Sequence, residues 1–223
     1  MRFVRENSLS LCFGLMFVAA LVGQAFAGLA DFNNQQLADG LAPISLGDYL
    51  TSSSFAVDVV ENWQSEYLQF LLYILLTVWL VQRGSPESKE LGKQGGESDE
   101  DQRVGRYAQQ DSPRWAATGG LRAALYSNSL GVVMGAIFVV SWFAQSVAGW
   151  AAYNEERLRQ LQDPLSWAGY LISADFWNRS LQNWQSEFLA IGSMAVLSIY
   201  LRQRGSPESK PVGVSHESTG VSG

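Results

Sequence analysis

The sequence has few of the residues on which catalytic and metal-binding proteins usually depend. Its 223 residues include one cysteine, Cys12, and one histidine, His216. These two residues cannot form an intramolecular disulfide, a His/Cys metal cluster or a convincing nucleophile–histidine pair. Acidic residues outnumber basic ones by 21 to 15, which argues against a nucleic-acid surface. We therefore expect no catalytic residue, no metal ion, no cofactor and no nucleic-acid partner.

An internal repeat is present instead. Residues 7–92 align with residues 128–213 without a gap, at an offset of 121 and with about 40% identity. The best matches are two polar motifs, Asn-Trp-Gln-Ser-Glu and Gln-Arg-Gly-Ser-Pro-Glu-Ser-Lys, and each of them occurs once in each copy. Similar apolar composition does not explain polar identities, so we interpret the chain as one unit written twice.

Each copy contains two apolar segments close to the ~20 residues that cross a bilayer. Buried helices of a soluble protein are the alternative, but four such segments with basic flanks in so short a chain disfavour it. The sequence thus predicts an all-α protein with four transmembrane helices, built from two tandem parallel repeats of a helix–loop–helix unit. The predicted helices cover about 9–27, 63–82, 129–149 and 184–202.

The same pattern predicts the domain organisation. A Gly-rich, acidic stretch with few apolar residues separates the copies, and such a composition is typical of a disordered tether. The expected parts are repeat 1, a largely disordered cytoplasmic linker, repeat 2 and a disordered tail, at residues 1–93, 94–126, 127–213 and 214–223.

The first apolar segment also resembles a secretory signal. Arg2 and Arg5 precede it, and Ala25-Phe26-Ala27 imitates a cleavage site. The matching segment of the second copy, residues 128–149, is internal and cannot be a signal peptide. We therefore interpret the first segment as a retained membrane helix, and cleavage stays the alternative.

Basic residues predict the orientation of the helices. No Lys or Arg lies in the loop between the first two predicted helices, and three Arg lie beside acidic residues in the loop between the last two. The N-terminus, the linker and the C-terminal tail hold most of the others. We expect both termini to be cytoplasmic, in a multi-pass protein of a bacterial cytoplasmic (inner) membrane.

The Asn-Trp-Gln-Ser-Glu motifs precede the second apolar segment of each copy, where a short span draws Glu66 and Glu187 to the outer edge of the hydrocarbon layer. Carboxylates at that depth normally face protein or a water-filled cavity. Trp63 and Trp184 lie where interfacial tryptophans are favoured. We expect a polar cluster at the outer surface, formed by Gln24, Asn62, Glu66, Gln145, Asn183 and Glu187.

This cluster has two interpretations. It is either a site for a cation, proton or small solute between the repeats, or hydrogen-bonded contact between helices that carries no ligand. The second interpretation is favoured.

The second motif is interpreted as a terminator of each second helix at the cytoplasmic surface. The arginine lies at a helix C-terminus, the glycine takes a left-handed conformation, and Ser-Pro-Glu begins a new helical turn. A docking element for a partner is the alternative. The residues concerned are Arg83, Gly84, Ser85, Pro86, Glu87, Lys89, Arg204, Gly205, Ser206, Pro207, Glu208 and Lys210.

Small residues are spaced for close helix packing. Gly131 and Gly135 form a G-x-x-x-G pattern, and Ser10 and Gly14 occupy the matching positions of the first copy. This spacing suggests either that the first helices of the two copies meet or that two chains pair.

The two motifs, an Asn-Ser-Leu start and a linker that contains Gly-Arg-Tyr together resemble a family of bacterial multi-pass membrane proteins, catalogued as a domain of unknown function. The resemblance covers nearly the whole chain. It implies a bacterial membrane protein, and no activity or substrate.

We expect an integral membrane protein with a structural or partner-binding role. The lipid bilayer is its expected partner, together with a second copy of the chain or another membrane protein. A small channel or transporter that uses the outer polar cluster is the alternative. An enzyme is not expected, since an acid dyad arises only if Glu66 and Glu187 approach each other.

Overall fold

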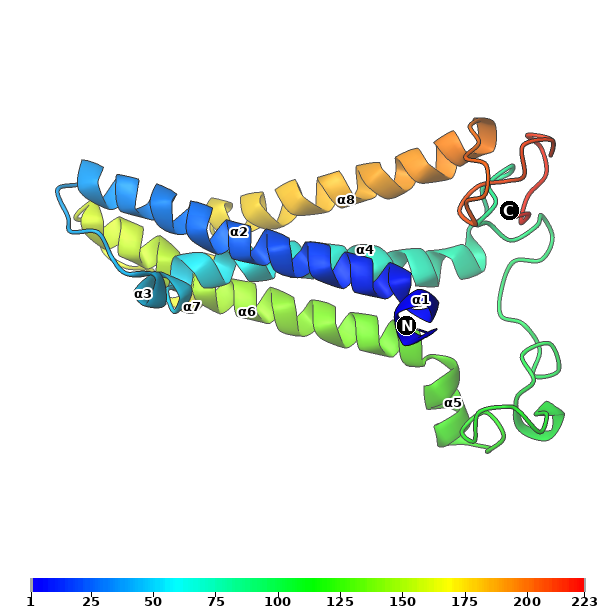
Figure 1. Cartoon of the computed structure of the whole chain (residues 1–223). Coiled ribbons are helices and arrows are strands. Elements are labelled where there is room, and N and C mark those ends of the chain that lie inside the picture. The colour runs from blue at the N-terminus through cyan, green and yellow to red at the C-terminus, as the bar shows by residue number, and fades with distance from the viewer. Residues whose placement is uncertain (1, 223) are drawn as a thin grey trace. The chain divides into compact units, whose positions relative to one another are not determined.

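The computed structural model describes residues 2–222, and within this range it contains helices and no strand (Figure 1). The expected all-α class is confirmed. Four helices are long, and short helical segments lie between or before them. In chain order the elements are α1 (Arg2–Glu6), α2 (Ser8–Ala38), α3 (Leu46–Leu50), α4 (Ser53–Trp79), η1 (Gly105–Tyr107), α5 (Leu121–Ser127), α6 (Ser129–Arg159), α7 (Trp167–Leu171) and α8 (Ala174–Tyr200).

The helix boundaries follow the sequence repeat. Helices α2 and α6 each have 31 residues, and α4 and α8 each have 27. The starts and ends of α6, α7 and α8 fall 121 residues after those of α2, α3 and α4. The two copies of the sequence therefore encode the same local structure in the same order.

Two helices, and not the expected four, are long and apolar enough to cross a membrane. They are α2 and α6, which have mean hydropathies of 2.0 and 1.9 over their most apolar stretches. Helices α4 and α8 are also long enough to cross a membrane, but the charged and amide side chains in their first halves lower their hydropathy. The expectation of four apolar spans is thus corrected for α4 and α8.

The long helices also begin or end away from the predicted positions. Helices α4 and α8 start about ten residues before Trp63 and Trp184, where the sequence predicts their beginnings. The reason is local: the hydroxyl oxygens of Ser52 and Ser173 accept hydrogen bonds from the backbone N–H groups of Phe55 and Phe176, at 3.2 and 3.3 Å. A serine at this position supplies an acceptor that the first turn of a helix lacks, so the helix starts there whatever the hydropathy of its first turns.

The chain divides into two compact units, each of which takes segments from both copies. The first comprises Met1–Val60 with Ala144–Leu171, and the second comprises Glu61–Phe143 with Ile172–Gly223.

In the first unit, an asparagine holds the chain that follows each long helix. The Asn33 side chain donates to the carbonyl oxygen of Ile44 at 3.1 Å and accepts from its N–H at 2.8 Å. Asn154 makes the same pair of bonds with Leu165, at 2.9 and 2.8 Å. Since both hydrogen-bonding atoms of the amide are used, the turn is held to the helix at a fixed register.

The turn held in this way places a tyrosine against a helix glycine. Tyr49 and Tyr170 are 3% and 0% exposed, and their hydroxyls lie over Gly28 and Gly149. A methyl group at Gly149 would lie 2.5 Å from the Tyr170 hydroxyl oxygen. Glycine is needed here because the ring approaches the helix backbone closely. Burial raises the pKa of Tyr49, and the nearby Asp58 and Asp31 charges add to this increase.

In the second unit, the glycines of α6 face α4. A methyl group built on Gly131 would lie 3.6 Å from Leu75, and one on Gly135 would lie 3.6 Å from Leu71. The partner helix is therefore α4, which the sequence analysis had not proposed. Gly14 has no such neighbour within 4 Å, and Ser10 is exposed.

The linker between the copies folds mainly into turns, with η1 and α5 as its helical parts. The N–H of Gly105 bonds to the carbonyl oxygen of Ala116 at 2.8 Å, and Trp115 meets Tyr126 edge to face. The expected disorder of residues 94–126 stays a prediction.

Candidate functional site

The two Asn-Trp-Gln-Ser-Glu motifs meet in the second unit. Trp184 of α8 donates its indole N–H to the side-chain oxygen of Gln64 of α4 at 2.8 Å. The Ser65 hydroxyl of α4 donates to a carboxylate oxygen of Glu187 at 3.4 Å. The contact therefore joins equivalent motifs, and it is made by their second, third, fourth and fifth residues. We call this contact the motif pair.

The motif pair contains polar side chains that are shielded from solvent. Gln64 and Ser65 are 0% and 1% exposed. The Gln64 amide nitrogen makes no hydrogen bond within the described residues, although it is fully buried. A buried amide donor without an acceptor costs free energy, so the polar groups of the motif pair are not all satisfied within the described residues.

An aromatic cluster covers one side of the motif pair. Trp142 of α6 packs against Trp184, with ring centroids 5.7 Å apart, and donates its indole N–H to the fully buried Ser180 hydroxyl at 3.3 Å. Phe176 and Trp177 complete the cluster at centroid distances of 6.0 and 6.2 Å from Trp142. Trp184 is half-buried against this cluster, whereas Trp63 is 41% exposed, and the predicted role of both as interfacial anchors stays a prediction.

An ion pair lies just before the motif pair along both helices. Arg179 of α8 binds Glu61 of α4 at 3.1 Å and Asp175 of its own helix at 3.4 Å. The Glu61 side chain is 17% exposed. The arginine thus joins the two helices next to the polar motif, where its charge is balanced by two carboxylates.

The structure divides the six residues of the predicted cluster between the two units. Four of them flank the motif pair: Glu66 and Asn62 are exposed on α4, and Glu187 and Asn183 are half-buried on α8. Among these four, Glu187 of α8 accepts the hydrogen bond from Ser65 of α4. The motif pair itself depends on Gln64 and Ser65, which sequence reasoning did not single out, although both recur in the second copy.

The other two predicted members, Gln24 and Gln145, belong to the first unit. Gln24 is half-buried, and Gln145 is fully buried with neither amide atom hydrogen-bonded in the described part of the chain. Both lie on the apolar helices α2 and α6, so each is a polar group in a candidate membrane span.

The terminator motifs form the same loop twice. In each, the N–H of the serine that follows glycine bonds to the carbonyl oxygen of the glutamine at 3.1 Å, for Ser85 and for Ser206. Gly84 and Gly205 have φ angles of 87° and 82°. A positive φ at the third of four turn residues is the conformation that favours glycine.

Each motif lysine then reaches the carbonyl oxygen six residues ahead at 2.9 Å, Lys89 to Gly95 and Lys210 to His216. The last bonds of the loop are thus the same in both copies.

This geometry corrects part of the terminator prediction. Helices α4 and α8 end at Trp79 and Tyr200, four residues before the motif arginines, so these residues do not cap a helix. The motif glycine does take the expected left-handed conformation, but within a turn. Ser-Pro-Glu forms a second turn and no new helix, and the Ser85 hydroxyl accepts from the nearby N–H of Glu87 at 3.4 Å.

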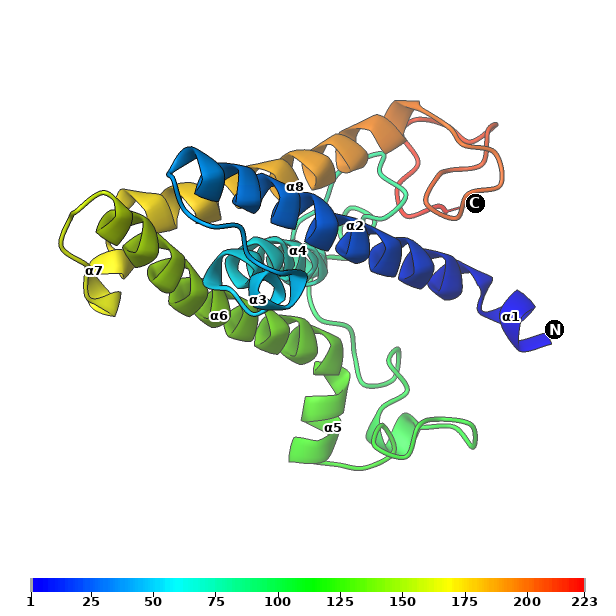
Figure 2. The same cartoon turned by 60° about the vertical axis from the view of Figure 1, so that its left-hand side comes forward.

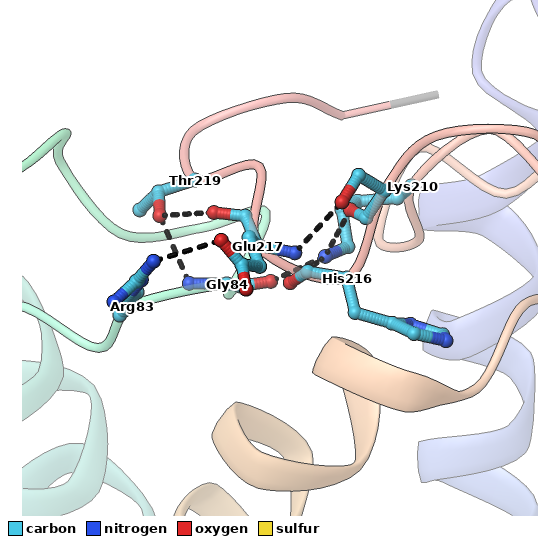
Figure 3. Close-up of polar contacts among 7 residues, drawn as sticks. Arg83, Gly84, Lys210, His216, Glu217 and Thr219 are labelled. Atoms are coloured by element: carbon cyan, nitrogen blue, oxygen red, sulfur yellow. Dashed lines mark hydrogen bonds and ion pairs between the residues drawn. The ribbon is translucent and has the colours of Figure 1, made fainter.

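The C-terminal tail packs on the first terminator loop (Figure 3). Glu217 forms an ion pair with Arg83 at 2.8 Å, and the Thr219 hydroxyl accepts from the N–H of Gly84 at 2.9 Å. Lys210 is 1% exposed, and its ammonium group lies 2.6 Å from the carbonyl oxygen of Gly84. We call this set of contacts the tail clasp.

The Lys210 ammonium is surrounded by backbone carbonyl oxygens. Besides Gly84 it contacts those of Ser215, His216 and Ser218, at 3.2, 2.9 and 3.3 Å. Burial lowers the pKa of Lys210, and the nearby Arg202 charge lowers it further. A buried cation with only carbonyl partners fixes the position of three chain segments at once, and this is a structural role.

Among residues 2–222, no group of three or more His, Cys, Asp or Glu side chains is arranged to hold a metal ion. The chemistry that the motif pair offers is hydrogen bonding and negative charge.

The comparison with known families decides the classification. The chain matches the domain of unknown function DUF6766 over residues 1–221. It belongs to this DUF6766 family. No curated protein and no solved structure matches the chain. Membership in the DUF6766 family covers both motif copies and the linker, and it assigns no activity.

Proposed function

We propose that this DUF6766 protein is an integral membrane protein with a structural or partner-binding role. The observation that carries the proposal is the exposure of its two most apolar helices. Only 6% of the most apolar stretch of α2 is buried, and 17% of that of α6. An apolar helix of a soluble core is mostly covered by protein, so these surfaces need another apolar environment, which the bilayer supplies.

The proposal extends to four spans in two tandem parallel repeats. Helices α4 and α8 each have 27 residues, about 40 Å at 1.5 Å per residue, which exceeds the ~30 Å hydrocarbon layer. Their polar first halves are tolerated in a membrane because Gln64, Ser65 and Glu187 bind one another or Trp184, and the motif pair removes them from lipid.

The proposed location is the bacterial inner membrane, with both termini in the cytoplasm. The excess of basic residues in the N-terminal segment, the linker and the tail supports this orientation. The terminator loops and the tail clasp then lie at the cytoplasmic surface. The lipid bilayer and a second copy or another membrane protein are the proposed partners, and no enzymatic activity is proposed.

Membrane insertion is tested by alkaline carbonate extraction of membranes that contain the full chain. Retention in the pellet supports the proposal, and release into the supernatant contradicts it. The topology is tested with single cysteines in a Cys12→Ser background, at Gly40, Gly96, Leu161 and Gly213. A membrane-impermeant maleimide should label positions 40 and 161 from outside and positions 96 and 213 only after the membrane is opened.

A small channel or transporter is the second candidate, because the motif pair contains a buried amide nitrogen without a hydrogen-bond partner and a carboxylate. The test is Glu66→Gln with Glu187→Gln. Glutamine accepts the Ser65 hydrogen bond as a carboxylate does, so the helix contact is retained while the negative charge is lost. Reduced cation flux into vesicles, with unchanged thermal stability, supports transport, and unchanged flux contradicts it.

A further inference from the structure

A cleft lies between the C-terminal halves of α4 and α8, next to the first terminator loop. The two helices diverge toward their C-terminal ends, where the loops lie between them (Figures 1 and 2). The cleft has a volume of about 590 Å³, which falls in the ~300–1,000 Å³ range of small-molecule sites. It is distinct from the motif pair, because none of Gln64, Ser65, Trp184 or Glu187 lines it.

The walls of the cleft are apolar. Helix α4 contributes Leu72 and Leu76, Leu80 follows its last residue, and helix α8 contributes Ile191 and Ala195. Leu76 is 47% exposed, so the wall is accessible in the chain as it stands. An elongated apolar group therefore fits between the helices.

The charge in the cleft has one sign. Glu87 of the first terminator loop is the one formally charged residue in its lining, and no Lys or Arg lines it. The Tyr73 hydroxyl donates a hydrogen bond to the Glu87 carboxylate. Glu208, the equivalent residue of the second loop, interacts with Glu87, and this interaction raises the pKa of Glu208. A second carboxyl group thus lies near Glu87, and a bound cation would offset the negative charge of both.

Contacts of the residues around Glu87 fix its position in the first terminator loop. Ser85 and Ser88, which flank it and also line the cleft, are 3% and 8% exposed. The carbonyl oxygen of Ser85 accepts from the N–H of Gly220 at 3.0 Å, and Lys210 holds Gly84. The tail clasp therefore presents the carboxylate to the cleft on a rigid support.

We propose that this cleft binds a cationic amphiphile, an apolar chain that ends in a protonated amine, with the chain between α4 and α8 and the amine on Glu87. The ammonium N–H groups donate to the Glu87 carboxylate, and the apolar walls cover the chain.

Binding is tested with dodecylamine on purified protein in phosphatidylcholine nanodiscs, with intrinsic tryptophan fluorescence as the readout. We expect saturable binding of dodecylamine and at least tenfold weaker binding of 1-dodecanol, which has the same chain and no charge. Equal affinity for the alcohol overturns the proposal.

Two pairs of variants separate specific binding from partition into lipid. Glu87→Gln should weaken dodecylamine binding at least tenfold, whereas Glu90→Gln, an exposed carboxylate outside the cleft, should leave it unchanged. Leu76→Trp should block the cleft, whereas Leu197→Trp, the same position in the second copy, should not. Binding that survives Glu87→Gln or Leu76→Trp overturns the proposal.

This proposal rests on the proposed membrane location in one respect only: the membrane is the expected source of the amphiphile. Carbonate extraction of the Glu87→Gln variant should match that of the unaltered chain. If Glu87→Gln loses dodecylamine binding but stays in the membrane pellet, the loss is due to the cleft. If both the variant and the unaltered chain are released from the membrane, the result contradicts the proposed function alone.

Discussion

The Lys210 ammonium group donates to the carbonyl oxygen of Gly84, 126 residues earlier in the chain, at 2.6 Å. The matching lysine of the first copy, Lys89, instead bonds to Gly95 and forms an ion pair with Glu97 at 3.1 Å. The two terminator loops are identical in sequence, but their lysines bind different segments of the chain. A substitution at one lysine can therefore serve as the control for the same substitution at the other.

Lys210→Ala should release the tail from the first terminator loop. Hydrogen bonds to a charged group contribute about 1.5–3 kcal/mol, so amide exchange at residues 215–220 should accelerate by about tenfold or more. Mass-spectrometric hydrogen exchange measures this. Lys89→Ala should leave residues 215–220 protected, and equal acceleration in both variants would contradict the assigned role of Lys210.

The contact between the two terminator loops should depend on pH through Glu208. Its hydrogen bond and charge contact with Glu87, together with burial, raise the pKa of Glu208. A raised carboxyl pKa means that the joined state binds the proton more tightly, so the contact is strongest at acidic pH and weakens as pH rises through the raised pKa.

Fluorophores attached near the two loops can report their separation across this range. The effect should be small because Glu208 is exposed. Glu208→Gln, which keeps a hydrogen-bond donor at every pH, should abolish the pH dependence, and an unchanged profile in this variant would show that another group titrates.

Gly149→Ala should destabilise the first unit. The new methyl group meets the buried Tyr170 hydroxyl oxygen at 2.5 Å, and overpacking of this kind costs about 1–3 kcal/mol. Thermal unfolding in detergent measures the loss. Tyr170→Phe combined with Gly149→Ala should recover part of it, because the colliding oxygen is removed.

The control for this substitution is Gly23→Ala in α2, where a methyl group meets nothing within 4 Å. It should be neutral or stabilising by up to about 1 kcal/mol, since alanine has the higher helix propensity. Similar losses at both positions would show that helix backbone effects, and not the Tyr170 contact, dominate.

Asn154→Asp should weaken the turn that follows α6. Aspartate keeps the acceptor for the N–H of Leu165 and loses the donor to its carbonyl oxygen. The Leu165 carbonyl oxygen keeps the indole N–H of Trp150 as a donor at 2.7 Å, so the unfolding temperature should fall only slightly. Asn33→Asp should lower it more, because leucine stands where the second copy has Trp150 and an unsatisfied polar group costs about 1–3 kcal/mol. Equal losses in the two variants would indicate that the Trp150 bond contributes little.

Sequence reasoning predicted the helical class and the correspondence between the copies, because both depend on patterns that repeat along the chain. It missed the true starts of α4 and α8, since a serine cap is a single hydrogen bond and leaves no trace in hydropathy. The same reasoning overestimated the number of apolar spans, because it began α4 and α8 after their charged first turns.

The sequence singled out the motif that forms the motif pair, but not the residues of it that are buried there. The Asn-Trp-Gln-Ser-Glu motif does bring α4 and α8 together, yet the buried partners are Gln64 and Ser65 and not the exposed Asn62 and Glu66. Which side of a helix is buried depends on where the neighbouring helix lies. Five consecutive residues place side chains on every side of a helix, so the motif alone does not indicate which of them are buried. The contact between Lys210 and Gly84 could not be predicted either, because no local sequence pattern relates these two distant residues.

The tail clasp also imposes an order on biosynthesis. The first terminator loop leaves the ribosome more than a hundred residues before Lys210 and the segment 215–220 that grip it. Until then the Gly84 carbonyl oxygen and the Arg83 guanidinium group lack these partners, so the tail clasp is among the last contacts of the second unit to form. A chain interrupted before residue 210 would therefore have a first terminator loop without any contact of the tail clasp.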